Sequence, residues 1–427
     1  MASKTNLSVV IDVGTSKITA LAGIKNSEGK TEILGASKLP SRGIKRGVIF
    51  NIEEAATSIG QVMDDLAGQV DGKIEKVDIA YAGQPMKIYE FKGMRLTSGD
   101  GVVTENDVNE LFNEAKEVNI EQDFTILHIL PQSFVIDNEI VDYSPVGITG
   151  RKIEATYKII AVPQNHIANF GRVLNKLGLE LGDVVLSPVA ASEAVLTEDE
   201  KELGVILLDI GAGTTKLSIF NEGALVHTAV IPFGGNVVTN DIKEGCSILP
   251  KWAEQLKTQY GQALGDFADE QKVVTIPGHS GWEPKEISFK SLAFIIQARM
   301  EEIVDSAFFQ VEKSGVAEDL GSGIVLSGGT SALNNLVSLV KFRTGMDARL
   351  AYSVLRPSAK IEGLEHPDFQ TVLGMLQMAL EKVDPFPKEK RKKPKKKKKE
   401  GGISPWLKNV VQGVLDYVDD DEDVALN

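Results

Sequence analysis

The sequence predicts an α/β fold made of two similar lobes, and three observations support this prediction. The segments VVIDVGTSK (residues 9–17) and ILLDIGAGTTK (residues 206–216) each have an apolar strand that ends in Asp and enters a turn of glycine and hydroxyl residues. Strand and helix patterns alternate in both halves of the chain. A chain of 427 residues is also longer than one ordinary hydrophobic core supports.

In the first half, the patterns predict strands at 7–13, 16–24, 32–39 and 76–83 and a helix at 52–70. Residues 84–165 read as an inserted unit with a helix at 104–118 and strands at 126–136 and 155–162. Thr104 is the expected N-cap of the inserted helix, with Asp107 in its N3 position. A further helix is bounded by Pro163 and Gly178.

The second half repeats this order. A helix of small residues at 188–196 and a charged loop at 197–204 precede the second strand–turn–strand unit. The later patterns predict a strand and turn within 223–235, helices near 251–259 and at 291–315, a strand with a glycine turn at 322–333 that leads into a helix, and a linker at 384–402.

The composition is that of a soluble globular protein, with 42% hydrophobic and 25% charged residues. One cysteine, Cys246, excludes an internal disulfide framework and fits a reducing cytosol. Five scattered histidines and this thiol give no metal-ligand spacing, so no structural zinc site is expected. The N-terminus does not read as a secretory signal, and no apolar run reaches the roughly 20 residues of a spanning helix. We therefore expect a cytoplasmic body.

The net charge of −14 conceals a basic C-terminal region. Residues 388–427 hold 11 basic and 8 acidic side chains, so the rest of the chain carries a net charge of −17. An acidic body argues against general nucleic-acid binding. The lysine-rich run at 388–399 could instead be a nucleic-acid tether, and this alternative stays open beside the membrane interpretation given below.

The two glycine turns have the chemistry of a phosphate site. Glycine turns expose backbone N–H groups to phosphate oxygens, and Lys17 could neutralise phosphate charge. Asp12 and Asp209, at the strand ends, could hold Mg²⁺ through water. One such turn alone is typical of an ordinary hairpin, but two copies in matching contexts favour a triphosphate–Mg²⁺ unit held from both sides of a cleft. No GxxxxGK[ST] motif is present, which excludes a P-loop.

A third glycine turn, LSGGTSALNNL at 326–336, follows a strand, and Gly328 and Gly329 would allow a base or ribose to approach closely. Glu254 and Lys257 lie three residues apart on one predicted helix face, from which they could reach the ribose or base. An ordinary surface ion pair explains these two residues equally well.

Together these motifs resemble the superfamily of actin, heat-shock chaperones and sugar kinases. Residues 12–17 match its phosphate-1 motif, 209–215 its phosphate-2 motif, 326–331 its adenosine motif and 186–196 its connecting helix. Within that superfamily the chain resembles the FtsA family of bacterial cell-division proteins over nearly its whole length. The marks are FGGNVVTNDI (233–242), AVLTEDEKELGV (194–205), the insert at 84–165, and a basic linker before a short amphipathic helix.

The resemblance implies an actin-like two-lobed fold of duplicated ribonuclease-H-like domains, with an inserted 1C subdomain in place of the usual 1B. The implied parts are subdomain 1A (1–83 and 166–195), 1C (84–165), 2A (196–235 and 313–384), 2B (236–312), the basic linker (385–402), a membrane-targeting helix (403–418) and an acidic tail (419–427). It also implies bound ATP and Mg²⁺. The residues expected at the nucleotide are Asp12, Gly14, Thr15, Ser16, Lys17, Asp209, Gly211, Ala212, Gly213, Thr214, Thr215, Gly234, Gly235, Asn236, Glu254, Lys257, Gly328, Gly329, Thr330 and Ser331.

The resemblance also implies partners. Members of this family form head-to-tail filaments at the membrane and recruit the tubulin-like protein FtsZ through its C-terminal peptide, which binds subdomain 2B. Other divisome proteins are implied as well. Arg299 and Glu302, one turn apart on the long predicted helix, are the candidates for the FtsZ site. A solvated helix face is an equally good explanation of that pair.

One departure from the superfamily concerns hydrolysis. Actin relatives with clear hydrolysis carry Gln or Glu near the start of the connecting helix, where this chain has Ser187 before Pro188. A hydroxyl cannot serve there as a carboxylate base, and nothing in the sequence aims nearby Glu193 at the phosphate. We expect ATP binding with slow hydrolysis at most, and no residue is nominated as catalytic base.

The C-terminal segment ISPWLKNVVQGVLDYV (403–418) predicts an amphipathic helix with Ser404 as N-cap and Pro405 at N1. Its apolar stripe consists of Trp406, Leu407, Val410, Val411, Val414, Leu415 and Val418. At about 1.5 Å per residue this helix is too short to span a bilayer, but it suits the interface, and the preceding lysines favour anionic lipid. A terminal helix docked on the body is the competing interpretation.

The leading hypothesis is therefore an actin-like, ATP-binding adaptor that polymerises on the inner face of the cytoplasmic membrane and tethers FtsZ filaments at the division septum. A sugar-kinase-like phosphotransferase would need an Asp base facing a substrate hydroxyl, and no convincing candidate is found. A pilus-assembly-type actin-like adaptor would lack the polybasic, amphipathic C-terminal device. A heat-shock-type chaperone is disfavoured because no β-rich peptide domain follows.

Overall fold

The computed structural model describes residues 7–381, apart from 27, 142–143, 279–282, 356–357, 359–360 and 362. The chain divides between residues 387 and 388, and everything below concerns the part before that point. The predicted linker (385–402), membrane-targeting helix (403–418) and acidic tail (419–427) lie outside the described residues.

The first lobe is built on a five-stranded sheet in the order β11-β6-β1-β2-β3. β1, β2 and β3 form an antiparallel meander, and β6 and β11 then add in parallel. The strands are β1 (Ser8–Val13), β2 (Lys17–Lys25), β3 (Thr31–Pro40), β6 (Lys76–Tyr81) and β11 (Glu180–Leu186), and a small hairpin of β4 (Ile44–Lys45) and β5 (Val48–Ile49) accompanies them.

The second lobe repeats this sheet strand for strand, in the order β14-β13-β12-β17-β18. Its first three strands are again an antiparallel meander, and the last two again add in parallel. The strands are β12 (Val205–Ile210), β13 (Thr215–Asn221), β14 (Ala224–Ile231), β17 (Ile324–Ser327) and β18 (Ala348–Leu350). The duplication expected from the paired Asp–glycine segments is therefore present in both strand order and strand direction.

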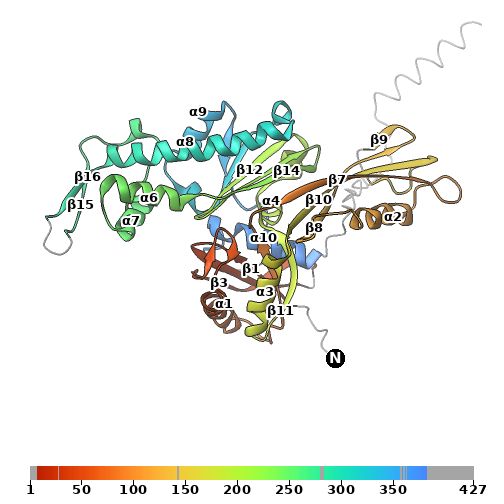
Figure 1. Ribbon diagram of the computed structural model, residues 1–427, viewed down its shortest axis with the longest axis horizontal. Helices are drawn as coiled ribbons and strands as arrows, with labels where there is room; N and C mark the ends of the chain where they lie inside the picture. Colours follow the sequence, from red (N-terminus) through yellow and green to blue (C-terminus); the bar gives the residue numbers. More distant parts are fainter. Residues whose placement is uncertain are drawn as a thin grey trace, which may run out of the picture. The chain divides into compact units, whose positions relative to one another are not determined.

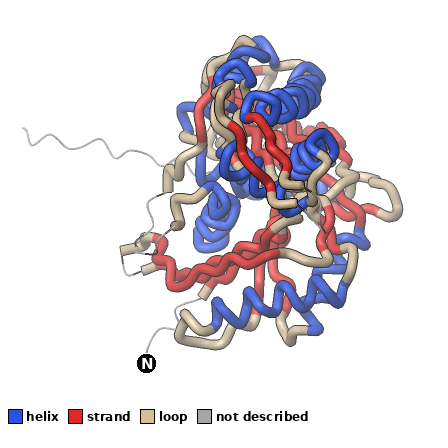
Figure 2. The backbone as a smooth tube through the Cα atoms, turned by 90° about the vertical axis from the view of Figure 1, so that its left-hand side faces the viewer, coloured by secondary structure: helices blue, strands red, loops and turns tan. Residues whose placement is uncertain are grey.

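Helices flank the sheets, as the two views show (Figure 1, Figure 2). In the first lobe these are α1 (Ile52–Ala67) and α3 (Gln164–Lys176), whose apolar faces share a core with β1, β2 and β6. α4 (Ser187–Val195) and α10 (Gln370–Glu381) share a third core with strands of both sheets. These two helices approach closely where a Cβ on Gly374 would lie 1.8 Å from the Ala190 carbonyl oxygen, so glycine is required there.

The helices of the second lobe are α5 (Glu198–Glu202), α6 (Gly235–Cys246), α7 (Pro250–Tyr260), α8 (Phe289–Ser314) and α9 (Leu336–Thr344). A hairpin of β15 (Val273–Ile276) and β16 (Lys285–Ser288) precedes α8. The short 3-10 helices are η1 (Gly265–Phe267), η2 (Ala317–Asp319), η3 (Gly329–Ala332) and η4 (Pro367–Phe369). None of the helices in the described part of the chain is long and apolar enough to cross a membrane.

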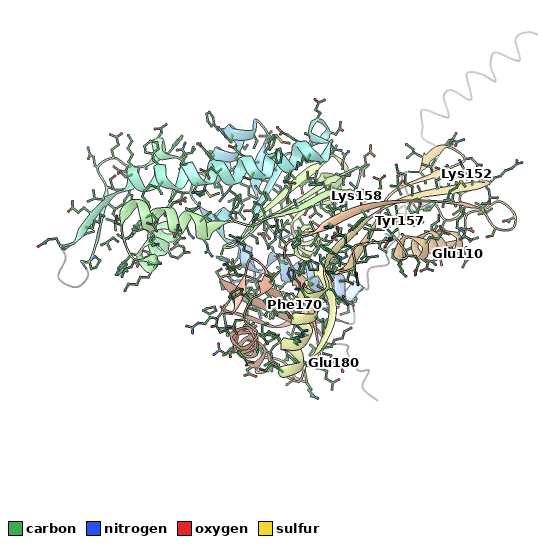
Figure 3. All side chains as sticks on the ribbon, viewed as in Figure 1. Glu110, Lys152, Tyr157, Lys158, Phe170 and Glu180 are labelled. Atoms are coloured by element: carbon green, nitrogen blue, oxygen red, sulfur yellow. The ribbon has the colours of Figure 1, made fainter. Side chains whose placement is uncertain are left out.

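The inserted unit is a separate four-stranded antiparallel sheet, in the order β7-β10-β8-β9, with one helix packed on it. Its elements are β7 (Lys87–Leu96), α2 (Glu105–Lys116), β8 (Phe124–Ile136), β9 (Glu139–Val141) and β10 (Lys152–Pro163). Fully buried Tyr157 lies in its core (Figure 3). Two side chains bind the second lobe: Gln132 donates to the Leu225 carbonyl at 3.1 Å, and Lys158 donates to the Val226 carbonyl.

Sequence patterns located many of the elements within a few residues, but the elements that they missed include β4, β5, β7, β9, β11, β15, β16, β18, α5, α6 and α10. Three of these differences have a local cause. The charged loop expected at 197–204 contains helix α5, because Thr197 and Glu200 form a capping box that starts it. β7 was not expected, because the exposed face of this edge strand mixes apolar residues such as Met94 and Leu96 with charged ones such as Glu90 and Lys92. α6 was not recognised as a helix, since it starts without a side-chain cap at Gly234. The capping box expected at Thr104 and Asp107 is confirmed.

Candidate functional site

Two equivalent hairpins form the centre of the candidate site. Four residues, Gly14 to Lys17, separate the last β1–β2 pair, Val13 and Ile18, and four residues, Gly211 to Thr214, separate the last β12–β13 pair, Ile210 and Thr215. Register places Asp12 opposite Thr19 and Asp209 opposite Lys216. The two aspartates are therefore structurally equivalent, but the two lysines are not: Lys17 ends the first turn, whereas Lys216 lies inside a strand.

Each turn starts with a glycine whose surroundings leave little room for a side chain. A Cβ on Gly14 would lie 2.7 Å from the Lys17 carbonyl oxygen, and one on Gly211 would lie 3.0 Å from the Thr214 carbonyl oxygen. The first distance is shorter than a carbon–oxygen contact allows and the second is tighter than an ordinary contact, because each turn brings its ends together. The repeated motif in the sequence therefore reflects a repeated backbone geometry.

The three glycine turns meet around one cavity. A Cβ on Gly213 would lie 2.3 Å from Thr15 Oγ1, so the two hairpins touch. A Cβ on Gly328 would lie 2.3 Å from Asp209 Oδ1, and one on Gly329 would lie 3.0 Å from Lys17 Nζ. The cavity is lined by Asp12, Val13, Gly14, Thr15, Ser16, Lys17, Thr19, Gly47, Ala82, Asp209, Gly211, Ala212, Gly213, Thr214, Lys216, Gly328, Gly329, Pro367, Asp368 and Thr371.

The remaining predicted nucleotide residues lie beside this cavity rather than on its lining. Thr330 Oγ1 donates to the Gly211 carbonyl at 3.0 Å, and the Gly235 N–H donates to the same oxygen at 2.9 Å. The Asn236 N–H donates to the Ala212 carbonyl at 2.8 Å. These bonds hold the second turn from behind. The other predicted nucleotide residues that do not line the cavity are Thr215, Gly234, Glu254, Lys257 and Ser331.

The predicted pair of Glu254 and Lys257 exists and has further partners. Lys257 Nζ donates to Glu254 Oε2 at 2.7 Å, to Thr239 Oγ1 at 2.8 Å and to the Gly235 carbonyl at 3.1 Å. The lysine side chain is only 8% exposed, whereas Glu254 is 49% exposed. The buried lysine thus ties α7 to the start of α6, and the ordinary surface ion pair considered above does not describe it.

Lys216 is a site residue that the sequence analysis did not nominate. Its ammonium donates to Asp209 Oδ2 at 2.8 Å and to Ser187 Oγ at 3.2 Å. Burial alone would lower the pKa of Lys216, but the charges of Asp209 and Asp12 outweigh it and raise the pKa, so the lysine stays protonated. The signal in the sequence was a lysine in strand β13, which comes directly after the second glycine turn.

Asp12 lies on the cavity lining. Burial in the surrounding chain raises the pKa of its carboxyl, and the charges of Lys216 and Lys17 oppose that shift. Asp209 and Asp368 add to it, because like charges disfavour ionisation. A cation near Asp12 would therefore stabilise the ionised form of this carboxyl.

Asp368 is the second site residue that was missed, and Lys17 forms an ion pair with it. Burial opposes ionisation of Asp368, but the hydrogen bond and charge of Lys17, together with His366 and Lys38, hold the pKa of this carboxyl below its ordinary value. No sequence motif surrounds Asp368 in η4, so only the fold brings it to the first glycine turn.

The two predicted metal-holding aspartates differ in what they offer. The Asp209 side chain is only 5% exposed, with one oxygen bonded to Lys216 and the other against Gly328. One of its oxygens, Oδ2, is therefore already bonded to a cationic side chain, which leaves less of this carboxylate for a hydrated metal ion. Asp12 fits better. Among the described residues, no group of three or more His, Cys, Asp or Glu side chains could hold a metal.

The predicted partner residues lie on α8, away from this cavity. Arg299 Nε donates to Asp241 Oδ2 at 2.5 Å, and Arg299 Nη1 donates to Glu302 Oε2 at 2.5 Å. The arginine side chain is about one-third exposed, so one face of the pair stays accessible. The pair links α6 to α8 and is more than a solvated helix face.

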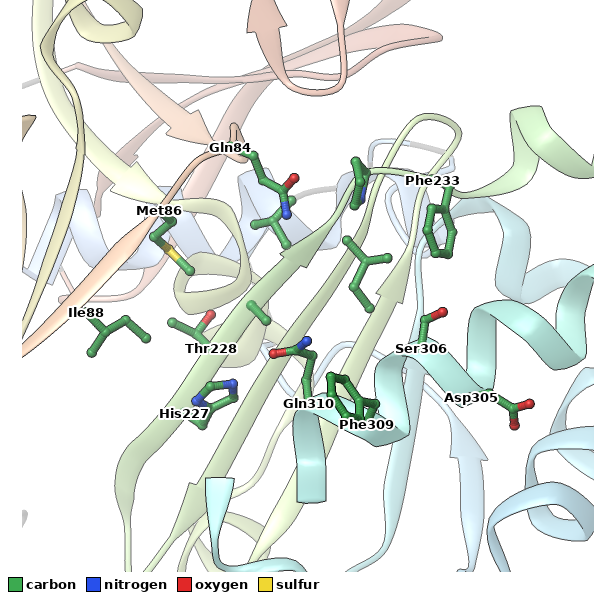
Figure 4. A pocket seen from close by; sticks show the side chains of 14 residues that line it. Gln84, Met86, Ile88, His227, Thr228, Phe233, Asp305, Ser306, Phe309 and Gln310 are labelled. Atoms are coloured by element: carbon green, nitrogen blue, oxygen red, sulfur yellow. The ribbon is translucent and has the colours of Figure 1, made fainter. Parts of the chain in front are cut away.

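A larger hollow of about 650 Å³ lies between β14, α8 and the start of β7 (Figure 4). Its lining is mostly apolar and uncharged, including Met86, Phe233 and Phe309. Its one acidic side chain, Asp305, is already bonded to Arg343. None of the three glycine turns contributes to it, so the smaller cavity is the better candidate for binding an anion.

Comparison with known proteins places the chain in a family. Residues 206–374 match the family model "Cell division protein FtsA", and residues 83–161 match "SHS2 domain inserted in FTSA". A cell division protein FtsA of Pseudomonas aeruginosa is 35% identical over 376 residues, which cover 88% of this chain and 89% of that protein. This chain belongs to the FtsA family.

Solved structures share the fold of this FtsA family member at low identity. The PilM–PilN type IV pilus biogenesis complex matches with a TM-score of 0.60 and 15% identity, covering 87% of this chain and 98% of that chain. MreB5 of Spiroplasma citri bound to ADP matches with a TM-score of 0.53 and 17% identity, covering 89% and 97%. The predicted fold class, an actin-like α/β fold with an inserted domain, is confirmed.

Proposed function

We propose that this FtsA family member is an ATP-binding adaptor of cell division that polymerises head to tail on the inner face of the cytoplasmic membrane. In this role it tethers FtsZ filaments to the membrane at the septum and contacts other divisome proteins. The observation that carries the nucleotide part is the convergence of three glycine turns on one cavity with Lys17 and Asp12 on its lining. The MreB5 structure of the same fold contains ADP, which supports the choice of ligand.

In this proposal the backbone N–H groups of the turns at Gly14 and Gly211 bind phosphate oxygens, and the hydroxyls of Thr15 and Thr214 add donors. The Lys17 ammonium, which is paired with Asp368, would then also bind phosphate oxygens, and its contact with Asp368 would weaken. Mg²⁺ would be held by the phosphates, by water and by Asp12, and would supply charge neutralisation. The cavity measures about 60 Å³, well below the roughly 300–1,000 Å³ of usual ligand pockets, so the turns must separate to admit a nucleotide.

Hydrolysis in this site would be slow. Ser187 begins the connecting helix α4, and its hydroxyl accepts a hydrogen bond from Lys216. A serine bonded to a protonated lysine is a poor general base, because the lysine withdraws electron density from the oxygen and neither group accepts a proton at neutral pH. Glu193, on the same helix, is bonded to Lys201 instead.

Membrane attachment is proposed from the residues beyond the described part of the chain. Trp406, Leu407, Val410, Val411, Val414, Leu415 and Val418 would enter the lipid interface, while the lysines of residues 388–399 would bind anionic headgroups. The FtsZ C-terminal peptide would bind near Arg299 and Glu302 on α8. The location that follows is peripheral, on the cytoplasmic side of the membrane at the division site.

Co-sedimentation with anionic liposomes and FtsZ tests this proposal. The full chain should carry FtsZ into the liposome pellet, and a chain that ends at residue 402 should leave FtsZ in the supernatant. Trp406→Glu is the sharper variant, since it places a charge in the apolar stripe while keeping the lysines. Equal pelleting of FtsZ by all three proteins would contradict the proposed tether.

A further inference from the structure

The floor of the proposed nucleotide site contains a fixed ion pair. Lys216 on β13 stands directly opposite Asp209 on β12 in the antiparallel register, and its ammonium lies 2.8 Å from Asp209 Oδ2. The side chains are 10% and 5% exposed, so water screens this pair weakly. Strand pairing on both sides of Lys216 fixes the backbone from which the ammonium reaches Asp209.

The same ammonium acts on both halves of the site. It donates to Ser187 Oγ, at the start of α4, at 3.2 Å. Its charge also acts on Asp12, the equivalent aspartate of the other hairpin. Lys216 lines the cavity together with the glycine turns, so it is close to any phosphate bound there.

Two ionised aspartates beside a polyphosphate create a concentration of negative charge that usually requires a divalent cation. In this chain the lysine already neutralises Asp209 through the bond to its Oδ2. Of the two hairpin aspartates, Asp12 is then the better placed to attract a metal ion. Unlike a metal ion, a lysine side chain cannot dissociate from the site.

We propose that the Lys216 ammonium takes over part of the charge role of Mg²⁺ here, so that the site binds nucleoside di- and triphosphates with little dependence on divalent cations. This inference rests on the proposed nucleotide binding. It adds that the site binds the metal-free nucleotide about as well as the metal-bound nucleotide. Lys216 acts here through Asp209, whose charge it neutralises, and it is therefore a positioning residue.

The experiment measures the dissociation constant of a fluorescent ADP analogue for the full-length protein, with excess Mg²⁺ and with EDTA at equal ionic strength. The ratio of the two constants is the coupling between metal and nucleotide, and typical couplings between two ligands amount to about 5–150-fold. The native chain should show a ratio below about 5-fold. Lys216→Met leaves the Asp209 carboxylate without its counter-charge, so the ratio should rise above about 10-fold.

Two further variants separate this charge effect from structural damage. In the double variant Asp209→Asn/Lys216→Met, both charges are removed together, and the ratio should return below about 5-fold. Lys201→Met is the matched control, because Lys201 is also buried and ion-paired, with Glu193 and Glu198, but does not line the cavity. Its ratio should equal that of the native chain. If Lys216→Met fails to fold, Lys216→Gln keeps a hydrogen-bond donor and removes the charge.

A ratio in the native chain above about 10-fold, or one that Lys216→Met or Lys216→Gln leaves unchanged, would overturn the inference. Absence of any ADP binding, with or without Mg²⁺, would instead contradict the proposed function itself. The two failures are therefore distinguishable in one titration.

Discussion

Lys17 and Asp368 form an ion pair although 351 positions separate them in the sequence. Lys17 ends the first glycine turn, and Asp368 lies in η4, just before α10. The Asp368 side chain is only 4% exposed and also accepts from Lys38 at 3.3 Å. This contact connects the proposed phosphate site to α10, the last helix in the described part of the chain. We therefore expect the first glycine turn and α10 to unfold together.

Replacing Asp368 with asparagine should lower stability at neutral pH by about 1 kcal/mol, because Lys17 is partly exposed and the pair is partly screened. The folded pKa of Asp368 lies below its ordinary value of 3.8, so the unfolded chain takes up the proton first as the pH falls. The difference between native chain and Asp368→Asn should therefore be constant above about pH 4 and shrink below it. Urea unfolding at several pH values measures it.

Asp347→Asn is the matched control for that experiment. Asp347 is paired with Lys341 at 2.9 Å, but its side chain is 93% exposed. The variant should lie within about 0.5 kcal/mol of the native chain at every pH. An equal loss in the free energy of unfolding of both variants would mean that the buried Lys17–Asp368 pair stabilises the fold no more than an exposed ion pair does.

Gly328→Ala should destabilise the second lobe and abolish nucleotide binding. The φ of Gly328 is +83°, and a Cβ there would lie 2.3 Å from Asp209 Oδ1 and 2.6 Å from the Ile210 carbonyl oxygen. Gly345→Ala is the control, since its φ is +72° but nothing lies within 4 Å of the added atom. The control should cost about 1 kcal/mol from the left-handed backbone alone, and Gly328→Ala at least about 3 kcal/mol. Similar urea midpoints for the two variants would contradict this assignment.

His128 makes the contact between the insert and the first lobe sensitive to acid. The Leu186 N–H donates to His128 Nε2 at 2.8 Å, and burial lowers the pKa of His128 from 6.5 to about 4. The unfolded chain therefore binds a proton that the folded chain excludes between these pH values, so stability falls as the pH drops from about 6.5 to about 4. The loss that His128 causes should amount to about 3 kcal/mol.

His128→Gln tests this, because an amide oxygen can still accept from Leu186 and does not titrate. The variant should show a shallower decline of its urea midpoint between pH 6.5 and pH 4 than the native chain. Parallel curves would exclude His128 as a source of the acid sensitivity. At pH 7 the two proteins should differ little.

Arg299→Ala should weaken binding of the FtsZ C-terminal peptide by about 10-fold or more, if the peptide uses this helix face as proposed. The matched control is Arg343→Ala. Arg343 makes two bonds of 2.7 Å to Asp305 on the same helix α8 and is comparably exposed. Fluorescence anisotropy of a labelled peptide measures both. Equal affinities of the two variants would move the peptide site away from Arg299.

Local sequence patterns were sufficient for the two hairpins, since each turn depends on a few adjacent residues. Asp12 and Asp209 occupy equivalent strand ends because the same glycine spacing builds the same backbone turn. The capping box at Thr104 was likewise readable from four residues. Edge strand β7 was missed because its exposed face carries apolar as well as charged residues, so the alternation of polar and apolar residues that marks a strand is broken.

The charge pairs of the site were beyond such patterns. Lys216 was visible in the motif, but only the strand register shows that its ammonium meets Asp209. Asp368 reaches Lys17 through the packing of α10 against α4 and the first sheet, which no segment of the chain encodes by itself. Residues that meet by tertiary packing therefore made up the missed part of the site.

The bonds that Gln132 and Lys158 make to the Leu225 and Val226 carbonyls have a consequence for solubility. β14 is an outer strand of its sheet, and unpaired backbone groups on such a strand readily recruit strands from other molecules. The insert covers the start of this edge strand, at Leu225 and Val226. Shortening the insert would thus expose the β14 edge and make the second lobe prone to aggregation. The insert therefore protects the second lobe, although in sequence it interrupts the first lobe.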